Sequence, residues 1–472
     1  MTLEAFLGKL RECRLIASVQ ASEGSPVDHP EILLKLAEAS IQEGVQILRL
    51  QGLENIRVIR AATRKPVIGL IKRSYPGSDI YITPTGAEVN ALIDTGCEVI
   101  ALDGTPRRRP NGENLKDLVA LIHANGRLAM ADCDCEVSAR YAVEAGADLV
   151  GTTLGGYTDA RPATEGPDLD LLRECLAHGV PAIAEGRYYE RWQVESALRI
   201  GAAAVVVGGA INDPVKQTRS LKPRAPFNGD VGAVDIGGTW LRFGRFNSAW
   251  ELLESDRVPN PKTREERLEW IRSIAERFRV EALGVSTGGI VDPATGICWT
   301  AKSHLMPDHV GIAFSESTLG LPTSAHGDGH ATAWGHACLP QFAGKRVATI
   351  ALGTGVGCGF VQDGKIWAGR RGEYPRLNDL WTANGTFESV LGGINLTSNP
   401  GEKEMSIARS ALHDALFAIR NLYFPDEVVV GGSVGLSDWL LPDVERGGAI
   451  PSPFGVDAGL YGAAALVLFP PR

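Results

Sequence analysis

The sequence predicts two α/β domains: an eight-stranded (β/α)8 barrel and, after it, a two-lobed domain that holds a ligand in its cleft. Three observations support this prediction. The chain has 472 residues, more than a single compact core usually holds. Eight short apolar runs recur within about the first 210 residues. A strand, a tight glycine turn and a second strand then occur twice, about 115 residues apart.

The first domain is predicted to span residues 1–222. Helix-like patterns such as ILLKLAEASIQEG lie between the apolar runs and close on a glycine suited to a helix C-cap. Eight buried parallel strands, each followed by a helix, form a closed barrel. The predicted strands are Leu15–Val19, Ile47–Leu50, Pro66–Ile71, Val99–Leu102, Leu128–Ala131, Leu149–Thr152, Ala182–Ala184 and Ala204–Val207.

A polar, proline-containing stretch follows the last of these runs, and we predict a linker at 223–229 and a second domain at 230–472. There, VGAVDIGGTWLRFGRF and VATIALGTGVGCGFVQDGKIWAG each predict two strands joined by a glycine turn. Helical patterns such as EERLEWIRSIAERF and SIARSALHDALFAIRNLYF lie after them. This duplication predicts two lobes with a ligand between them.

Composition narrows the class of partner. Lys plus Arg is 47 and Asp plus Glu is 56, and the net charge of −9 opposes binding to nucleic acid through a basic face. No apolar stretch approaches the roughly 18 residues of a membrane span, and the eight cysteines form no CxxC pair. We therefore expect a cytoplasmic homo-oligomer with reduced thiols and small-molecule substrates, and neither nucleic acid nor a membrane as partner.

Polar residues at the ends of the barrel strands are the candidates for chemistry, because active sites of such barrels lie at the carboxyl ends of the strands. Lys72 ends an apolar strand, where desolvation and neighbouring arginines would lower its pKa toward use as a general base. Glu185 is similarly placed. The full set is Gln20, Arg49, Gln51, Lys72, Arg73, Asp103, Thr105, Asp132, Thr153, Tyr157, Glu185, Arg187, Gly208 and Gly209.

Bare glycines after the last two strands, including Gly186, suit backbone amides that point at a phosphate. A base, a carboxylate and a phosphate cradle together predict proton abstraction next to the carbonyl of a phosphorylated sugar. The alternative is that these strand-end side chains only satisfy loop backbone and solvent.

Six motifs in order resemble the N-acetylmannosamine-6-phosphate 2-epimerases, which are TIM barrels: GLIKRSYPGSDIYITPT, VIALDGTPRRRP, LAMADCD, GTTLGGYT, AIAEGR and VVVGGAI. The resemblance covers residues 10–215. It implies that Lys72 moves the C2 proton of the ring-opened sugar and that Glu185 helps ring opening or holds the enol. It also implies sugar contacts from Gln20, Arg49 and Asp132, and phosphate contacts from Gly186, Gly208 and Gly209.

One departure affects the phosphate site of the barrel. The Thr-Arg that follows the last motif in the family is Asn212-Asp213 here. We therefore predict that Arg187 supplies the cation of the phosphate site.

In the second domain, three glycine turns are predicted to surround a nucleotide: DIGGT at 235–239, GTG at 353–355 and the turn at Gly432. Asp235 could hold Mg²⁺ through water, and Thr239 could bind a phosphate. Asp328 lies between two glycines and could accept the proton of a sugar hydroxyl during phosphoryl transfer. The alternative for Asp328 is an ordinary turn residue.

DIGGT, STGGIVDPATG, GDGHATA, LGTGVGCGF and VVVGGSVG resemble the ROK family of sugar kinases, over residues 231–468. The resemblance implies an actin-like, ribonuclease H-like pair of lobes that binds ATP with Mg²⁺, and it implies that Asp328 is the catalytic base. The implied ATP-binding residues are Asp235, Gly237, Gly238, Thr239, Gly353, Thr354, Gly355 and Gly432. The implied sugar-binding residues are Gly288, Gly289, Glu373 and Glu388.

Three residues depart from the ROK pattern. Arg376 stands where the family has a zinc-binding His, Thr386 replaces a Cys, and His330 replaces an Asn two residues after the base. We therefore expect no structural zinc, and Mg²⁺ bound with ATP as the only metal.

Together these patterns predict a bifunctional enzyme of amino-sugar (sialic acid) catabolism. It would phosphorylate N-acetylmannosamine with ATP and convert the product to N-acetylglucosamine 6-phosphate. The alternative is an active epimerase whose second half only senses a sugar or nucleotide and regulates the barrel.

Overall fold

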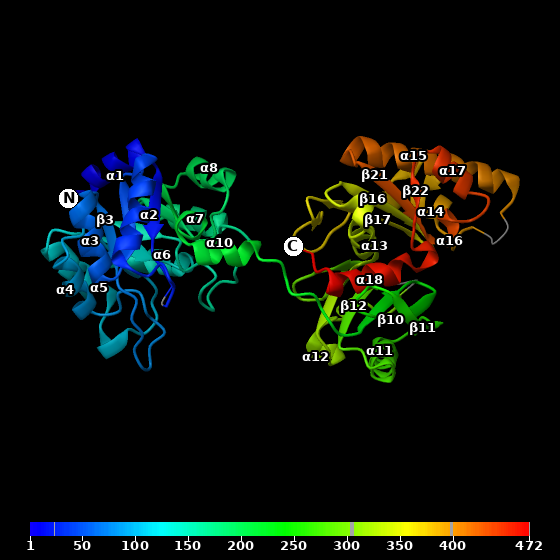
Figure 1. Cartoon of the computed structure of the whole chain (residues 1–472), viewed down its shortest axis with the longest axis horizontal. Helices are drawn as coiled ribbons and strands as arrows, with labels where there is room; N and C mark the ends of the chain where they lie inside the picture. The colour runs from blue at the N-terminus through cyan, green and yellow to red at the C-terminus, as the bar shows by residue number, and fades with distance from the viewer. Residues whose placement is uncertain (23, 303–305, 397–399, 472) are drawn as a thin grey trace. The chain divides into compact units, whose positions relative to one another are not determined.

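The computed structural model describes residues 1–22, 24–302, 306–396 and 400–471, and the chain divides into two compact units, Met1–Pro223 and Arg224–Arg472 (Figure 1). Residues 223–228, within the predicted linker, form neither helix nor strand. Each unit has hydrophobic cores of its own.

The first unit is a closed barrel of eight parallel strands in sequence order, as predicted. The strands are β1 (Leu15–Val19), β2 (Ile47–Gln51), β3 (Val67–Leu70), β4 (Val99–Asp103), β5 (Leu128–Asp132), β6 (Leu149–Gly151), β7 (Ala182–Glu185) and β8 (Ala204–Val207). No strand end differs from its predicted position by more than one residue. Asp103, Asp132 and Glu185 are thus the last residues of their strands.

Helices surround the barrel strands (Figure 1). They are α1 (Leu3–Glu12), α2 (Pro30–Gln42), α3 (Leu53–Thr63), α4 (Gly86–Ile93), α5 (Leu115–Ala124), α6 (Glu136–Glu144), α7 (Leu169–Leu176), α8 (Arg191–Ile200), α9 (Gly209–Asn212) and α10 (Pro214–Leu221). Neighbouring strand residues such as Ile16 and Ala17 belong to two different cores. Both faces of each strand are therefore buried, and this is why the strands are continuous apolar runs in the sequence.

The second unit contains two five-stranded sheets of similar topology, ordered β11-β10-β9-β12-β15 and β18-β17-β16-β21-β22. In the first sheet, β9 pairs antiparallel with β10 and parallel with β12. In the second, β16 pairs antiparallel with β17 and parallel with β21, which confirms the predicted duplication. The first sheet comprises β9 (Val231–Ile236), β10 (Trp240–Phe246), β11 (Leu252–Pro259), β12 (Ala282–Thr287) and β15 (Thr323–Gly327). The second comprises β16 (Val347–Leu352), β17 (Val356–Gln362), β18 (Lys365–Ile366), β21 (Glu427–Gly431) and β22 (Ile450–Pro451).

Helices α13 (Asp328–Ala337) and α18 (Ala458–Leu468) pack against each other between these sheets (Figure 1). A Cβ on Gly462 would lie 2.3 Å from the carbonyl oxygen of Ala331, so only glycine allows this close approach. The other helices are α11 (Arg264–Phe278), α12 (Glu316–Leu319), α14 (Phe387–Leu391), α15 (Glu402–Tyr423), α16 (Gly432–Gly435) and α17 (Leu441–Arg446). Two small ribbons pair β13 (Ile290–Val291) with β14 (Cys298–Thr300), and β19 (Trp381–Thr382) with β20 (Gly385–Thr386).

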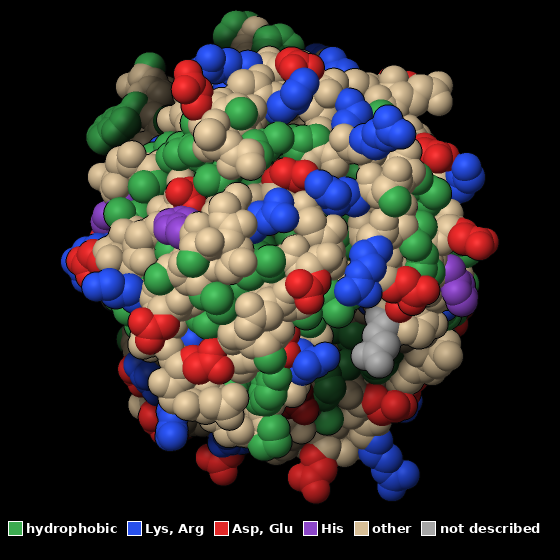
Figure 2. Space-filling view, turned by 90° about the vertical axis from the view of Figure 1, so that its left-hand side faces the viewer, with side chains coloured by type: hydrophobic (Ala, Val, Ile, Leu, Met, Phe, Trp, Pro, Cys, Tyr) green, Lys and Arg blue, Asp and Glu red, His purple; other side chains and the backbone are tan. Residues whose placement is uncertain are grey.

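The surface carries charges of both signs. Figure 2 shows Lys and Arg side chains interspersed with Asp and Glu over one face of the barrel unit. Within the described ranges, no helix has the length and apolar character needed to cross a bilayer.

Candidate active sites

The first candidate site is a cavity of about 350 Å³ at the carboxyl ends of the barrel strands. Nearly all of the barrel residues predicted to touch substrate line it; Asp132 does not, but it accepts a hydrogen bond from the lining residue Arg49. The polar residues and glycines in the lining are Ser18, Gln20, Ser22, Arg49, Lys72, Tyr81, Thr153, Tyr157, Glu185, Gly186, Arg187, Tyr188, Tyr189, Gly208, Gly209, Asp213 and Lys216.

A buried ion-pair network joins three of these strand ends. Arg49 is only 1% exposed; its Nη2 donates to Asp132 Oδ2 at 2.7 Å, and its Nε lies 3.1 Å from Glu185 Oε2. Thr153 donates its hydroxyl to Asp132 Oδ1 at 2.6 Å. Burial alone would lower the pKa of Arg49, but the two carboxylates raise it, so the guanidinium stays charged. The network fixes the position of Glu185 in the cavity.

Lys72 and Glu185 have pKa values shifted toward neutrality. Lys72 is open to the cavity, where its ammonium donates to Gln20 Oε1 at 3.0 Å. Desolvation by the protein around it, and then the charge of Arg49, lower the pKa of Lys72. Burial, aided by repulsion from Asp132, raises the pKa of Glu185 to about 7. The lowered pKa makes Lys72 neutral more readily than an ordinary lysine, and the raised pKa lets Glu185 hold or release a proton near pH 7.

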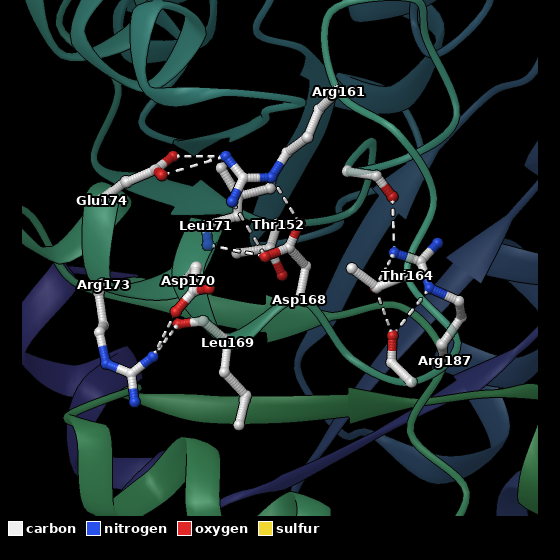
Figure 3. Close-up of polar contacts among 12 residues, drawn as sticks. Thr152, Arg161, Thr164, Asp168, Leu169, Asp170, Leu171, Arg173, Glu174 and Arg187 are labelled. Carbon is white, nitrogen blue, oxygen red and sulfur yellow. Dashed lines mark hydrogen bonds and ion pairs between the residues drawn. The ribbon is translucent and has the colours of Figure 1, made fainter. Parts of the chain in front are cut away.

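Arg187 lines this cavity, but much of its guanidinium is engaged by a loop. Its Nε donates to Gly166 O at 3.0 Å, and its Nη2 donates to Gly155 O at 2.9 Å and to Thr164 Oγ1 at 3.1 Å (Figure 3). Three of its five N–H donors are thus used to hold the loop. The prediction that Arg187 is the phosphate cation did not anticipate these bonds, because they depend on how the loop folds.

A second arginine holds the same loop. Arg161 pairs with Asp168 at 2.6 Å and with Glu174 at 2.8 Å (Figure 3). Asp168 also caps α7 by accepting from Leu171 N at 2.9 Å. The wall of the cavity after β6 is therefore tied to the helix that follows it.

The second candidate site is a cavity of about 560 Å³ in the second unit, and its lining comes from both sheets. The predicted residues in its lining are Asp235, Gly237, Gly238, Gly288, Gly289, Asp328, Gly353, Thr354, Gly355, Glu388 and Gly432. Thr239 Oγ1 lies 3.2 Å from Thr354 Oγ1, so the first two glycine turns meet. Gly432 has a φ of +86°, and a Cβ there would lie 2.3 Å from Leu352 O, so this turn requires glycine.

Asp328 is the first residue of α13, directly after β15. Its Oδ1 accepts a hydrogen bond from Gly329 N at 2.7 Å. Burial raises the pKa of Asp328 to about 6, and the nearby carboxylates of Asp235 and Glu388 add to this effect. A carboxylate with a raised pKa at a cavity wall is a suitable proton acceptor.

Arg242, which sequence reasoning did not identify, lies against the Asp235 carboxylate. It stands opposite Asp235 in the β9–β10 hairpin, and its Nε donates to Asp235 Oδ2 at 3.0 Å. Its Nη1 also donates to Asp457 Oδ1 at 3.1 Å. Asp235 is therefore paired with an arginine through its Oδ2. Cross-strand pairing in the predicted hairpin was the signal that could have found this contact.

The predicted sugar-binding residues are only partly brought together. Glu388 lines the cavity, accepts from Val356 N at 2.8 Å and pairs with Lys302 at 2.6 Å. Glu373 does not line it: its exposed carboxylate accepts from Arg371 N at 2.7 Å and closes a local turn. The residues just after Glu373 that do line the cavity are Tyr374 and Arg376.

The positions that depart from the ROK pattern show no metal cluster in the described ranges. Arg376 pairs with Asp379 at 2.6 Å, and the buried ring of His330 lies 5.7 Å from that of Tyr374. Burial lowers the pKa of His330 to about 3, so the ring is neutral. Among the residues described, no three His, Cys, Asp or Glu side chains are grouped to hold an ion.

The two halves of the chain resemble two known families. Residues 33–222 match the N-acetylmannosamine-6-phosphate epimerase family, NanE, and residues 231–377 match the ROK family. The bifunctional enzyme NanE/NanK of Brucella melitensis is 31% identical over 98% of both chains, and that of Brucella suis is 31% identical over 98% of this chain and 96% of its own. A solved N-acetylmannosamine-6-phosphate 2-epimerase from Clostridium perfringens is 42% identical over 47% of this chain and 96% of its own, with a TM-score of 0.45.

Proposed function

The chain belongs to the family of bifunctional NanE/NanK enzymes, and we propose that its two cavities carry out consecutive reactions on one amino sugar. The second unit transfers the γ-phosphoryl group of ATP to the 6-hydroxyl of N-acetylmannosamine. The barrel then converts N-acetylmannosamine 6-phosphate to N-acetylglucosamine 6-phosphate. These two reactions belong to amino-sugar catabolism, such as the breakdown of sialic acid, in the cytoplasm where ATP is available.

In the barrel, the reaction inverts C2 of the ring-opened sugar. Neutral Lys72 removes the C2 proton, which is acidic because it lies next to the C1 aldehyde, and the electron pair moves to the carbonyl oxygen. Glu185, whose raised pKa keeps a share of it protonated at pH 7, donates a hydrogen bond to that oxygen in its protonated form and stabilises the enol. After rotation about the C2–C3 bond presents the other face of C2, the Lys72 ammonium returns a proton to C2 and is neutral again, the electron pair moves back from the oxygen, and C2 is inverted. The Arg49 network keeps Glu185 in place through this cycle.

In the second unit, Asp328 accepts the proton of the 6-hydroxyl as its oxygen attacks the γ-phosphorus, and ADP leaves. The glycine turns at 237–239 and 353–355 hold the phosphate oxygens with backbone amides and with the hydroxyls of Thr239 and Thr354. Mg²⁺ keeps water and phosphate ligands and needs only one or two protein carboxylates, so it fits beside Asp235, whose Arg242 bonds use Oδ2. When bound, it would neutralise charge on the β- and γ-phosphates.

The observation that carries this proposal is the meeting of Lys72 and Glu185, both with pKa values shifted toward neutrality, in one cavity beside a glycine turn. The alternative of a non-catalytic second unit is not favoured, because the bifunctional relatives match the chain over nearly its whole length.

A substrate panel on the full-length protein tests the proposal. We expect ADP release with N-acetylmannosamine and MgATP, and C2 epimerisation of the 6-phosphate but not of the unphosphorylated sugar. ADP release that needs no sugar, or epimerisation that ignores the phosphate, would contradict it.

A further inference from the structure

The lining of the barrel cavity includes Gly208 and Gly209 and, from the start of helix α10, the charged residues Asp213 and Lys216. Asp213 is the N-cap of α10: its Oδ1 accepts from Lys216 N at 2.9 Å. Its side chain is only 5% exposed, and its Oδ2 has no hydrogen-bond partner among the described residues. A buried carboxylate at a cavity wall repels an anion unless a cation offsets it.

Lys216 is the cation placed to do this. Its Nζ lies 3.3 Å from Asp213 Oδ2, and its side chain is 56% exposed. A Cβ built on Gly209 would lie 3.5 Å from Lys216 Cδ, so the lysine stem runs beside the glycine turn. Lys216 and Lys72 both line this cavity.

Arg187, another cation in the lining, has three of its N–H donors engaged by loop acceptors. The Lys216 ammonium has three donors, Asp213 is its one ion-pair partner among the described residues, and its flexible stem can turn it toward a ligand.

We propose that Lys216 binds the phosphate group of the barrel's substrate and balances the Asp213 carboxylate beside it. The glycine turn at 208–209 receives one side of the phosphate and the lysine the other. This inference rests on the proposed epimerase function and adds to it the residue that recognises the phosphate.

The test compares full-length variants by their epimerase kinetics on N-acetylmannosamine 6-phosphate and their inhibition by inorganic phosphate. For Lys216→Met we expect the KM and the phosphate inhibition constant to rise by about tenfold to a hundredfold, the worth of a charge-assisted hydrogen bond, with kcat nearly unchanged. Lys216→Arg should keep most of the affinity. Arg219→Met is the matched control, because it removes a positive charge from the same helix outside the cavity lining.

A second variant separates phosphate binding from a purely local role. If Lys216 only neutralises Asp213, the double variant Asp213→Asn, Lys216→Met will recover the normal KM, and this result would overturn the proposal. A Lys216→Met variant that matches Arg219→Met would also overturn it.

If the unmodified protein does not epimerise the sugar phosphate, the proposed function fails. Inorganic phosphate should still raise the thermal midpoint of the barrel, and Lys216→Met should abolish that rise if the proposal holds.

Discussion

Asp328→Asn should make the second unit more stable while it removes kinase activity. Burial raises the pKa of Asp328 from 3.8 to about 6, so the folded chain holds this proton more tightly than the unfolded chain does. The side chain therefore destabilises the fold increasingly as pH rises from 3.8 to about 6, and the full cost is present above that range. Each pKa unit corresponds to about 1.4 kcal/mol, so the full cost is about 3 kcal/mol.

Asparagine avoids this cost, because it does not ionise and its oxygen can still accept the Gly329 N–H. We expect the variant to gain up to about 3 kcal/mol in free energy of unfolding at pH 7.5 and only about 1 kcal/mol at pH 4.5. Urea unfolding followed by a probe specific to the second unit measures both values. The same variant should bind sugar and ATP but transfer phosphate roughly 10²-fold to 10⁴-fold more slowly. A loss of stability at pH 7.5, the same gain at both pH values, or a normal kinase rate would refute the reasoning.

Three further outcomes follow from the two cavities. Lys72→Met should lower epimerase activity by on the order of 10²-fold or more and leave the kinase intact; solvent deuterium entering C2 at the normal rate would exclude Lys72 as the base. If protonated Glu185 acts, kcat/KM of the epimerase should fall as pH rises through about 7, and Glu185→Gln should lack this limb of the pH profile. After chelation, Mg²⁺ alone should restore the kinase, and elemental analysis of the folded protein should show no stoichiometric zinc.

Much of the barrel could be predicted because its strands are buried on both faces. A run such as Leu128–Asp132 is then continuously apolar and ends on a polar residue at the cavity end of the barrel. The same rule brought Lys72 and Glu185 to one cavity, since carboxyl ends of parallel strands meet there. The glycine turns of the second unit were predictable for a related reason: close backbone approach at Gly432 excludes any Cβ.

Contacts that depend on side-chain direction and loop shape could not be predicted from local patterns. Glu373 matches the sugar-binding motif in sequence, yet its carboxylate accepts a hydrogen bond from Arg371 N and does not line the cavity. Arg187 donates hydrogen bonds to a loop more than 20 residues earlier in the chain. Its partner Gly166 carries no sequence signal for this contact. The Lys216–Asp213 pair depended on where helix α10 begins, and that boundary became visible only in the structure.

Both activities can be followed in a single experiment. Full-length protein is incubated in D₂O with N-acetylmannosamine and MgATP, and the reaction is followed by ³¹P and ¹H NMR. We expect ADP to form, N-acetylmannosamine 6-phosphate to rise and fall, and N-acetylglucosamine 6-phosphate to accumulate with deuterium at C2. Absence of ADP formation, or a sugar phosphate that keeps its original configuration and its C2 proton, would contradict the assignment of two consecutive reactions to this chain.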